Sequence, residues 1–236
     1  VKSYDGHKYN KTAPAWLIKK LLKISEKQVD DSFDVSRQNR KLPSKLDEKL
    51  MYILGLLAGD GHLRYSYKDK HVTTIALSNA DKEVINLYKK YLKDLFNVNE
   101  LKNTGKYDYY FCSPAIGTFL ANLGIPYKNK SKILSIPDYL IFLPENLVTS
   151  YLRGIYDTDG YVHLPPSGTQ VIYYTMSKKM ADSLRMVLLR FKILSNIRRK
   201  KEDANEIVKR RKAGKEKGNS NKLIDINLTY ILKLQK

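Results

Sequence analysis

An internal repeat is the feature that most constrains what this chain of 236 residues can fold into. Two largely apolar segments, 45–61 and 144–160, both end in Asp-Gly, and their glycines and acids lie 99 positions apart. The same offset continues downstream and aligns Ser78 with Ser177. A chance motif would not hold one register over such a length, so we infer two copies of a single unit.

Each copy is predicted to fold as helix, two strands, helix, two strands, helix. The first helix of copy one is expected to begin at Ser44-x-x-Asp47, and that of copy two to begin near Pro144. Alternating patterns predict strands at 63–67, 72–77, 161–164 and 171–176, and helical spacing predicts helices at 81–95 and 180–192. Further strands are expected near 107–112 and 223–226, with a helix at 114–123 that Gly124 ends. The fold class is therefore α+β, with two pseudo-symmetric αββαββα subdomains.

The repeat also sets the expected domains. Residues 1–43 form a basic N-terminal extension with an amphipathic helix near 14–27, and 44–123 form the first subdomain. A proline-rich linker, 124–143, leads to the second subdomain at 144–236.

Small residues lie four positions apart on each repeated helix, as Gly55 with Gly59 and Gly154 with Thr158. This spacing lets two helix backbones approach closely. The apolar run is too short to cross a membrane, so we expect the two helices to pack together about a pseudo-twofold axis.

Asp60 and Asp159 end the two repeated helices. A carboxylate at a helix C-terminus is disfavoured by the helix dipole, so a positive partner is expected beside it. A hard divalent cation such as Mg²⁺, which prefers carboxylate and carbonyl ligands, would serve. The alternative is that Asp-Gly is an ordinary turn dipeptide.

The paired segments resemble the LAGLIDADG homing endonucleases in their single-chain, two-motif form. The first copy matches the consensus at Gly55, Leu56, Asp60 and Gly61, and the second at Leu152, Gly154, Asp157, Asp159 and Gly160. One departure is Ala58, where the consensus has its first aspartate.

The resemblance implies a metal site in which Asp60 and Asp159, with Gly59 and Thr158 beside them, share two or three divalent ions. Mg²⁺ is expected, Mn²⁺ would substitute, and Ca²⁺ would bind without cleavage. It further implies that Asn79 and Lys178 begin the second helices as catalytic residues, and that Lys130 is an active-site lysine. Each subdomain would carry a four-stranded antiparallel, saddle-shaped sheet on DNA, with the motif helices at the subdomain interface.

Strand alternation divides the expected sheet faces. Ile75, Leu77, Tyr174 and Met176 should cover the helices, which leaves Thr74, Ala76, Tyr173 and Thr175 facing outward toward DNA. Nearby candidate DNA contacts are His62, Arg64, Tyr65, Lys68, Lys70 and His71, while His62 and His163 are too isolated to bind zinc. A basic segment, 198–222, holds 11 Lys/Arg against 4 Asp/Glu and adds Arg198, Arg199, Lys200, Lys201, Lys209, Arg210, Arg211 and Lys212 as phosphate contacts.

Composition agrees with a polyanionic partner, because 43 basic residues against 24 acidic ones give a formal charge of +19. The single cysteine, Cys112, excludes an internal disulfide and is expected in the core. Neither a signal peptide nor a membrane span is predicted, so we expect a cytoplasmic location, or an organelle matrix.

We therefore predict a monomeric, Mg²⁺-dependent, intron-encoded endonuclease that makes a staggered double-strand cut in a long, imperfectly palindromic DNA site. An alternative of another class is an RNA maturase or non-cleaving binding protein that acts on intron RNA. A basic structural protein of a ribonucleoprotein would explain the charge but not the repeated Asp-Gly helices.

Overall fold

In the computed structural model, the helices and strands follow the order that the repeat predicts. The structure describes residues 40–66, 71–127, 129–164, 166, 169–199 and 224–228. These residues divide into two units. Unit 1 comprises Val1–Lys130 with Pro137–Thr158, and unit 2 comprises Ser131–Ile136 with Asp159–Lys236. Among the described residues, no helix is long and apolar enough to cross a bilayer.

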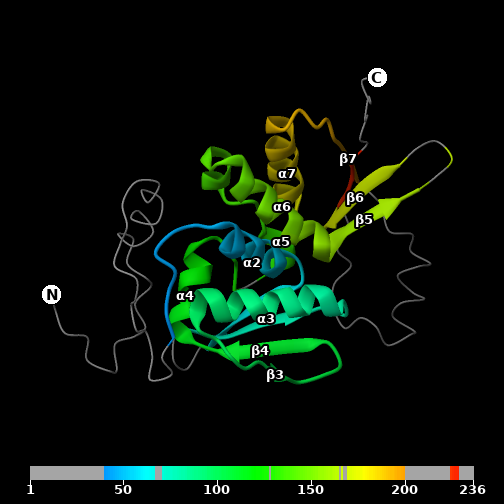
Figure 1. The fold of residues 1–236 in the computed structure, drawn as a ribbon. Coiled ribbons are helices and arrows are strands. Elements are labelled where there is room, and N and C mark those ends of the chain that lie inside the picture. Colours follow the sequence, from blue (N-terminus) through cyan, green and yellow to red (C-terminus); the bar gives the residue numbers. More distant parts are fainter. Residues whose placement is uncertain are drawn as a thin grey trace. The chain divides into compact units, whose positions relative to one another are not determined.

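Unit 1 is built on a four-stranded antiparallel sheet in the order β1-β2-β4-β3. Its strands are β1 (Gly61–Ser66), β2 (His71–Ser78), β3 (Lys102–Asn103) and β4 (Asp108–Cys112). The helices of this unit are α2 (Glu48–Gly59), α3 (Lys82–Phe96), α4 (Pro114–Asn122) and α6 (Glu145–Asp159), with a 3₁₀ turn at Asp138–Phe142. In Figure 1, α4 and α2 lie against the sheet and α3 lies alongside α2.

Polar side chains fix where these helices begin. Asp47 caps α2 by accepting from the backbone N–H of Leu50 at 2.8 Å, so the helix starts three residues later than the Ser44 cap predicts. Ser113 caps α4, and Gly124 follows its end with φ of +107°, as expected for a residue after a helix C-cap. The sequence prediction of this helix and its stop is confirmed.

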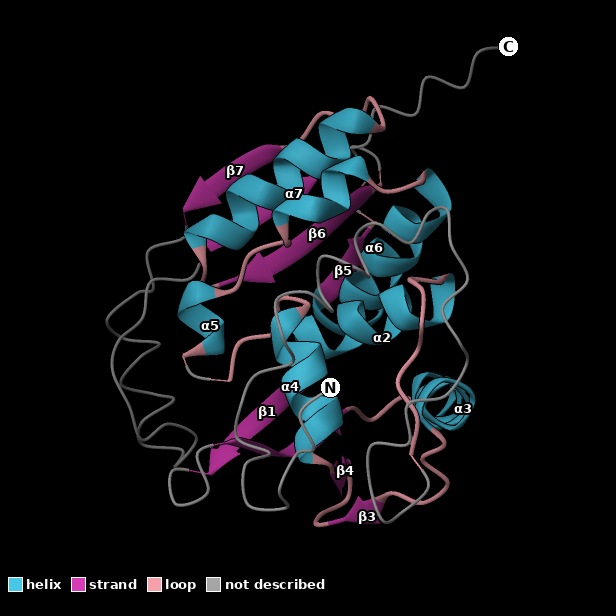
Figure 2. Ribbon diagram, turned by 90° about the vertical axis from the view of Figure 1, so that its left-hand side faces the viewer, coloured by secondary structure: helices cyan, strands magenta, loops and turns pink. Residues whose placement is uncertain are grey.

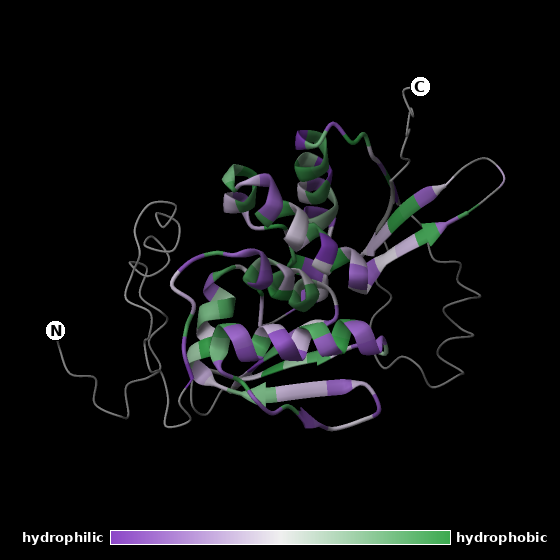
Figure 3. Cartoon of the chain, in the orientation of Figure 1, coloured by the Kyte–Doolittle hydropathy of each residue, from purple (hydrophilic) through white to green (hydrophobic). Residues whose placement is uncertain are grey.

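Helix α2 forms the centre of the core of unit 1, because every residue from Leu50 to Ala58 is buried. Figure 3 shows the apolar colouring of α2 beside the more polar outer surface of α3. The buried side of α3 is formed by residues such as Tyr88 and Leu92. A helix that is apolar on all sides is typical of one enclosed by its neighbours.

The two motif helices, α2 and α6, cross at Gly55 and Gly154 inside unit 1. A Cβ atom added to Gly55 would lie 2.3 Å from the carbonyl oxygen of Tyr151. One added to Gly154 would lie 2.5 Å from the carbonyl oxygen of Tyr52. Since Tyr52 and Tyr151 are themselves 99 positions apart, the crossing has the pseudo-twofold symmetry that the small residues predict.

Unit 2 contains a second antiparallel sheet in the order β5-β6-β8-β7. Its strands are β5 (Gly160–His163), β6 (Gln170–Thr175), β7 (Asn196–Arg199) and β8 (Ile224–Leu228), and its main helix is α7 (Lys178–Arg190). Figure 2 shows α7 lying along β6 and β7. All but the first residue of a short helix, α5 (Lys130–Ile133), also belongs to this unit, and the hydroxyl of Ser177 donates to the carbonyl of Leu134 at 2.5 Å.

The repeat changes its offset inside the second copy. Strands β1 and β5 begin 99 positions apart, but the N-caps of α3 and α7, Asp81 and Ser177, are 96 apart. The buried side chains of the two helices then align at the same offset, as Val84 with Met180, Ile85 with Ala181, Tyr88 with Leu184 and Leu92 with Leu188. The hairpin register explains the three residues by which the offset falls, since Gly61 pairs with Leu77 whereas Gly160 pairs with Tyr173. A constant offset of 99 is therefore wrong beyond the first strand of each copy.

The division into units differs from the boundaries that the repeat suggests, because α6 groups with the unit that contains α2. The expected N-terminal helix near 14–27 and most of the basic segment 198–222 lie outside the described residues.

Candidate functional site

Asp60 lies at the C-terminal end of α2, where it forms the C-cap with φ −85° and ψ −2°. Its carboxylate accepts a hydrogen bond of 2.8 Å from the side-chain amide of Asn79, which lies just before α3. The backbone N–H of Ser78 also donates to the carbonyl of Asp60, at 3.2 Å. The structure therefore brings together two of the residues that the sequence analysis assigned to one half-site.

Burial and the neighbouring polar groups have opposite effects on the ionisation of the Asp60 carboxyl. Partial burial raises the pKa of the Asp60 carboxyl above its ordinary value. The hydrogen bond from Asn79 and the charge of Lys130 act in the opposite direction and favour the carboxylate. Asn79 and Lys130 thus offset part of the cost of placing an acid at this end of a helix.

Lys130 places its ammonium group on the backbone at the end of α2. Its Nζ atom donates to the carbonyl of Leu57 at 3.2 Å and also to the carbonyls of Gly59 and Gly61. The last turn of α2 contains no basic residue of its own. Lys130 therefore supplies the positive partner that the exposed carbonyls and Asp60 require.

The donor set at this end of α2 fits a hard divalent cation. It offers the carboxylate of Asp60 and the carbonyl of Gly59, which are oxygen ligands of the kind that Mg²⁺ and Ca²⁺ prefer. A cation, the ammonium of Lys130, already lies on the Gly59 oxygen. Among the described residues, no group of three or more His, Cys, Asp or Glu side chains forms a metal site.

Asp159 belongs to unit 2 and has different neighbours. The hydroxyl of Tyr173 donates to its carboxylate at 3.4 Å. The preceding residue, Thr158, turns its hydroxyl back to the carbonyls of Gly154 and Ile155, at 3.2 and 3.0 Å. A phenol thus contacts the second motif acid, whereas an amide and an ammonium contact the end of the first motif helix.

Lys178 does not occupy the position in copy two that Asn79 occupies in copy one. Its side chain is 77% exposed and pairs with Asp182 at 2.6 Å, one turn along α7. The counterpart of Asn79 is Thr175, since Thr175 accepts from the N–H of Ser177 as Asn79 accepts from that of Asp81. The predicted equivalence of Asn79 and Lys178 is therefore wrong, because the β5–β6 hairpin is three residues shorter than the β1–β2 hairpin.

A cluster that sequence reasoning missed joins the two motif helices. The hydroxyl of Tyr52 on α2 donates to the carboxylate of Asp157 on α6 at 2.7 Å. Arg153 lies 3.4 Å from the same carboxylate and 5.2 Å from the centre of the Tyr52 ring. By the offset of 99, the mirror pair is Tyr151 with Ala58, and alanine accepts no hydrogen bond from a side chain.

Tyr151 shows the consequence of that missing acceptor. It is 1% exposed, and its hydroxyl has no hydrogen-bond partner among the described residues. The departure from the consensus at Ala58 therefore leaves one half of a symmetric pair unsatisfied.

The outer face of the first sheet carries the predicted DNA contacts of copy one. His62 and Arg64 on β1 are exposed, and Arg64 lies beside Thr74 of β2, which lies beside Cys112 of β4. Partial desolvation by neighbouring groups, together with the charges of Arg64 and Lys130, lowers the pKa of His62, while Asp108 opposes the shift. This face thus presents a basic side chain and hydroxyl or thiol groups.

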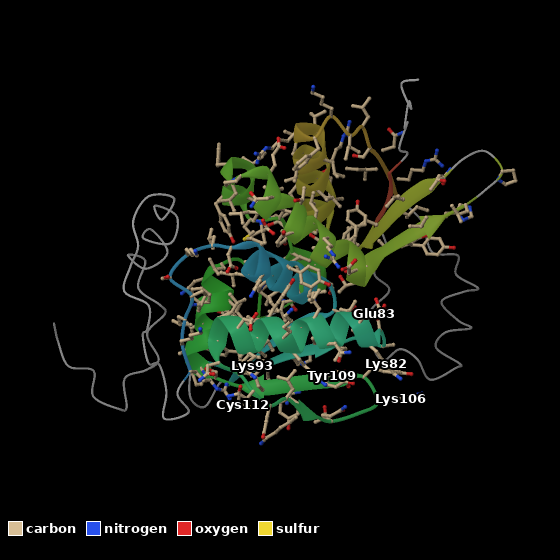
Figure 4. The ribbon with its side chains drawn as sticks, viewed as in Figure 1. Lys82, Glu83, Lys93, Lys106, Tyr109 and Cys112 are labelled. Atoms are coloured by element: carbon tan, nitrogen blue, oxygen red, sulfur yellow. The ribbon has the colours of Figure 1, made fainter. Side chains whose placement is uncertain are left out.

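One prediction about this sheet is wrong. Cys112 is exposed rather than buried, because alternation along β4 places Phe111 in the core and Cys112 on the other face; Figure 4 labels Cys112 on this strand. Ala76 lies on the outer face with its register partners His62 and Tyr110, as alternation predicts, but these larger neighbours leave it only 3% exposed.

The parity of the second sheet, in contrast, is the reverse of the prediction. Tyr173 is fully buried and Tyr174 is 40% exposed, because the register places Tyr173 opposite Gly160, as Leu77 is placed opposite Gly61. The exposed aromatic residues of this sheet include Tyr161, at 52%, whose ring stacks on His163 at 6.2 Å. Tyr161 and His163 lie two positions apart on β5, so strand alternation could have identified both as residues of one face.

The remaining candidates differ in what the structure describes. Tyr65 stacks on Tyr127 at 4.9 Å, and Arg198 is exposed on β7. His71 and Arg199 lie in strands, and nothing further is described of their side chains. Outside the described residues lie Lys68, Lys70, Lys200, Lys201, Lys209, Arg210, Arg211 and Lys212.

Comparison with curated proteins finds relatives with different names and functions. A probable translation initiation factor IF-2 of Methanocaldococcus jannaschii is 30% identical over 175 residues, which is 72% of this chain and 14% of that protein. A glutamine–fructose-6-phosphate aminotransferase of the same organism is 31% identical over 172 residues, 70% of this chain and 15% of that protein. The chain thus spans about a seventh of the length of these relatives.

Among solved structures, the fold is similar to that of the homing endonuclease I-DmoI. The structure of I-DmoI in complex with DNA and Ca has a TM-score of 0.51 and 15% identity, and the match covers 77% of this chain and 83% of that chain. A family model described as a LAGLIDADG-like domain matches residues 47–113 and 146–220. Because this model matches both copies of the repeat and more than half of the chain, the protein belongs to the LAGLIDADG homing endonuclease family.

Proposed function

We propose that this chain is a site-specific DNA endonuclease that makes a metal-dependent staggered cut in both strands of a long, imperfectly palindromic target. The observation that carries the proposal is the group formed by Asp60, Asn79 and Lys130 at the end of α2. A protein that only bound nucleic acid would gain nothing from an acid held at the unfavourable end of a helix beside an amide and an ammonium.

The two motif acids, the Gly59 carbonyl and Asn79 each have a part in the proposed reaction. A divalent cation bound to Asp60 and the Gly59 carbonyl would polarise a phosphate oxygen and activate water. Asn79 fixes the orientation of the Asp60 carboxylate through its amide. Asp159 is the corresponding acid of the other copy, and the hydroxyl of Tyr173 orients it.

The outer sheet faces are the proposed DNA surface. Exposed His62 and Arg64 on β1, and Tyr161 and Tyr174 of the second sheet, provide base-edge and phosphate contacts. A formal charge of +19 favours a duplex partner and makes binding strongly dependent on salt. We propose that the protein acts as a monomer, since one chain holds both motifs.

The relatives favour a different origin from the intron-encoded one predicted from the sequence. An initiation factor and an aminotransferase share no activity, yet in each of them about a seventh of the protein's length matches this chain. We infer that related segments occur as insertions in unrelated proteins, as in inteins. Sequencing the reading frame on both sides of this segment in its gene tests this origin, which a flanking stop codon on each side would contradict.

Cleavage of a randomised duplex library in Mg²⁺, followed by sequencing of the products, tests the function. The protein should release products with short 3′ overhangs at one site family, and Asp60→Asn and Asp159→Asn should each abolish the double-strand cut. Asp94→Asn, which removes an exposed acid paired with Lys49, is the matched control and should cleave normally. Tight binding to intron RNA with no cleavage of any library member would instead indicate the maturase.

A further inference from the structure

The ammonium group of Lys130 occupies a position that the proposed metal site also requires. It donates to the carbonyls of Leu57, Gly59 and Gly61, which lie 69 to 73 positions earlier in the sequence. The Gly59 carbonyl is the proposed backbone ligand of the metal and directly precedes Asp60 in the sequence. Both a divalent cation and an ammonium would lie within about 3 Å of that oxygen.

Two cations on one carbonyl oxygen repel strongly, because the site is partly buried and weakly screened. The ammonium of Lys130 offsets part of the rise that burial causes in the pKa of Asp60, which means that it stabilises the carboxylate charge. A divalent cation at Asp60 would make the same interaction with twice the charge. The two cations therefore compete for one set of oxygens.

We propose that Lys130 is an internal counter-ion that occupies the cation site at the end of α2 in the metal-free protein and is displaced when a divalent cation binds. This inference rests on the proposed function, because it assumes a metal at Asp60. The lysine side chain has a flexible four-carbon stem, so its ammonium can leave the carbonyls without movement of the backbone.

The exchange has a physical benefit for a metal-free protein. Without Lys130, the carbonyls at the end of α2 and the Asp60 carboxylate would lose the positive charge of this ammonium. With it, the negative charge of the site is offset, and metal binding carries the cost of moving the lysine. The affinity for metal is thus lower than the oxygen ligands alone would give.

Acylation of lysine side chains in the full chain tests the displacement directly. Lys130 should react slowly without metal because three carbonyls hold its ammonium, whereas the exposed Lys132, two residues along the chain, should react quickly. Added Ca²⁺ should raise the rate at Lys130 several-fold relative to Lys132, as measured by mass spectrometry of the digested protein. Continued protection of Lys130 in saturating Ca²⁺ would overturn the proposal.

Calorimetric titration of Ca²⁺ into the protein without DNA gives an independent measurement. Lys130→Met should bind Ca²⁺ at least about tenfold more tightly, because no ammonium must leave. Lys132→Met removes the same charge nearby and should change the dissociation constant by less than about twofold. Lys130→Gln serves if the methionine variant does not fold, and equal shifts in the Lys130 and Lys132 variants would reduce the effect to general electrostatics and overturn the exchange.

Asp60→Asn separates this proposal from the proposed function. If Ca²⁺ binds to the wild type but not to Asp60→Asn, the metal site stands, and the Lys130 measurements decide the exchange alone. If neither the wild type nor Lys130→Met binds Ca²⁺, the metal site itself is wrong and the exchange falls with it.

Discussion

Removing one hydroxyl from either of two symmetry-related tyrosines should change stability in opposite directions. Tyr52 donates to Asp157 at 2.7 Å across the α2–α6 crossing. Its mirror residue, Tyr151, is fully buried, and no hydrogen-bond partner of its hydroxyl is found among the described residues. Tyr52→Phe and Tyr151→Phe are therefore the same chemical change at equivalent positions, and each is the control for the other.

The magnitudes follow from the hydrogen bond and from the cost of burial. A hydrogen bond to a charged group contributes about 1.5–3 kcal/mol, and Asp157 keeps its contact with Arg153, so Tyr52→Phe should destabilise by about 1.5 kcal/mol. A buried hydroxyl without a partner costs about 1–3 kcal/mol, part of which the small void left by the oxygen cancels. Tyr151→Phe should then stabilise by about 1 kcal/mol.

Urea denaturation measures both effects. With a slope of about 2 kcal/mol per molar urea, the midpoints of the two variants should differ by roughly 1 M, with the wild type between them. If both variants shift in the same direction, or if Tyr151→Phe destabilises by more than about 1 kcal/mol, the mirror relation between Tyr151 and Ala58 is refuted.

Other predictions concern the crossing, the half-sites and the motif acid. Gly55→Ala should destabilise the protein by about 2 kcal/mol, since overpacking against the Tyr151 carbonyl, 2.3 Å from the new Cβ atom, outweighs the gain in helix propensity. The control Gly105→Ala, whose Cβ atom meets only the end of the Asp108 side chain at 3.3 Å, should be nearly neutral in the same urea assay. Lys178→Met should leave the cleavage rate within about threefold of wild type, whereas Asn79→Ala should lower it at least about tenfold in single-turnover assays. With EDTA present to remove metal, the free energy of unfolding of the wild type should fall as the pH rises from about 4 through the raised pKa of Asp60. The reason is that the folded state binds the Asp60 proton more tightly than the unfolded state does. Asp60→Asn should lack this decline.

Much of the fold was predictable because the repeat contains the information twice. The Asp-Gly helices, both hairpins and the helix ended by Gly124 appear where the apolar periodicity places them. Within the candidate site, Lys130 was predicted from the family resemblance and lies at the end of α2. The small residues of the motif helices likewise predicted the close crossing at Gly55 and Gly154.

The errors arise where the two copies differ in length. A hairpin that is three residues shorter changes the parity of β6, so Tyr173 rather than Tyr174 becomes buried, and it moves the helix start so that Lys178 loses its alignment with Asn79. Both strands of this hairpin contain apolar and aromatic residues on either face, so alternation alone could not fix the register. The Tyr52–Asp157 bond joins side chains 105 positions apart and has no local signal.

The contact between Gly55 and Gly154 is one of backbone against backbone, and that has a consequence for how such proteins diversify. Since backbone rather than side-chain contact decides the distance between the helices here, neighbouring positions other than Tyr52, Arg153 and Asp157 are free to vary as long as the two glycines remain. Halves taken from different relatives should therefore recombine at this crossing into new chains whose two proposed DNA surfaces have separate ancestries.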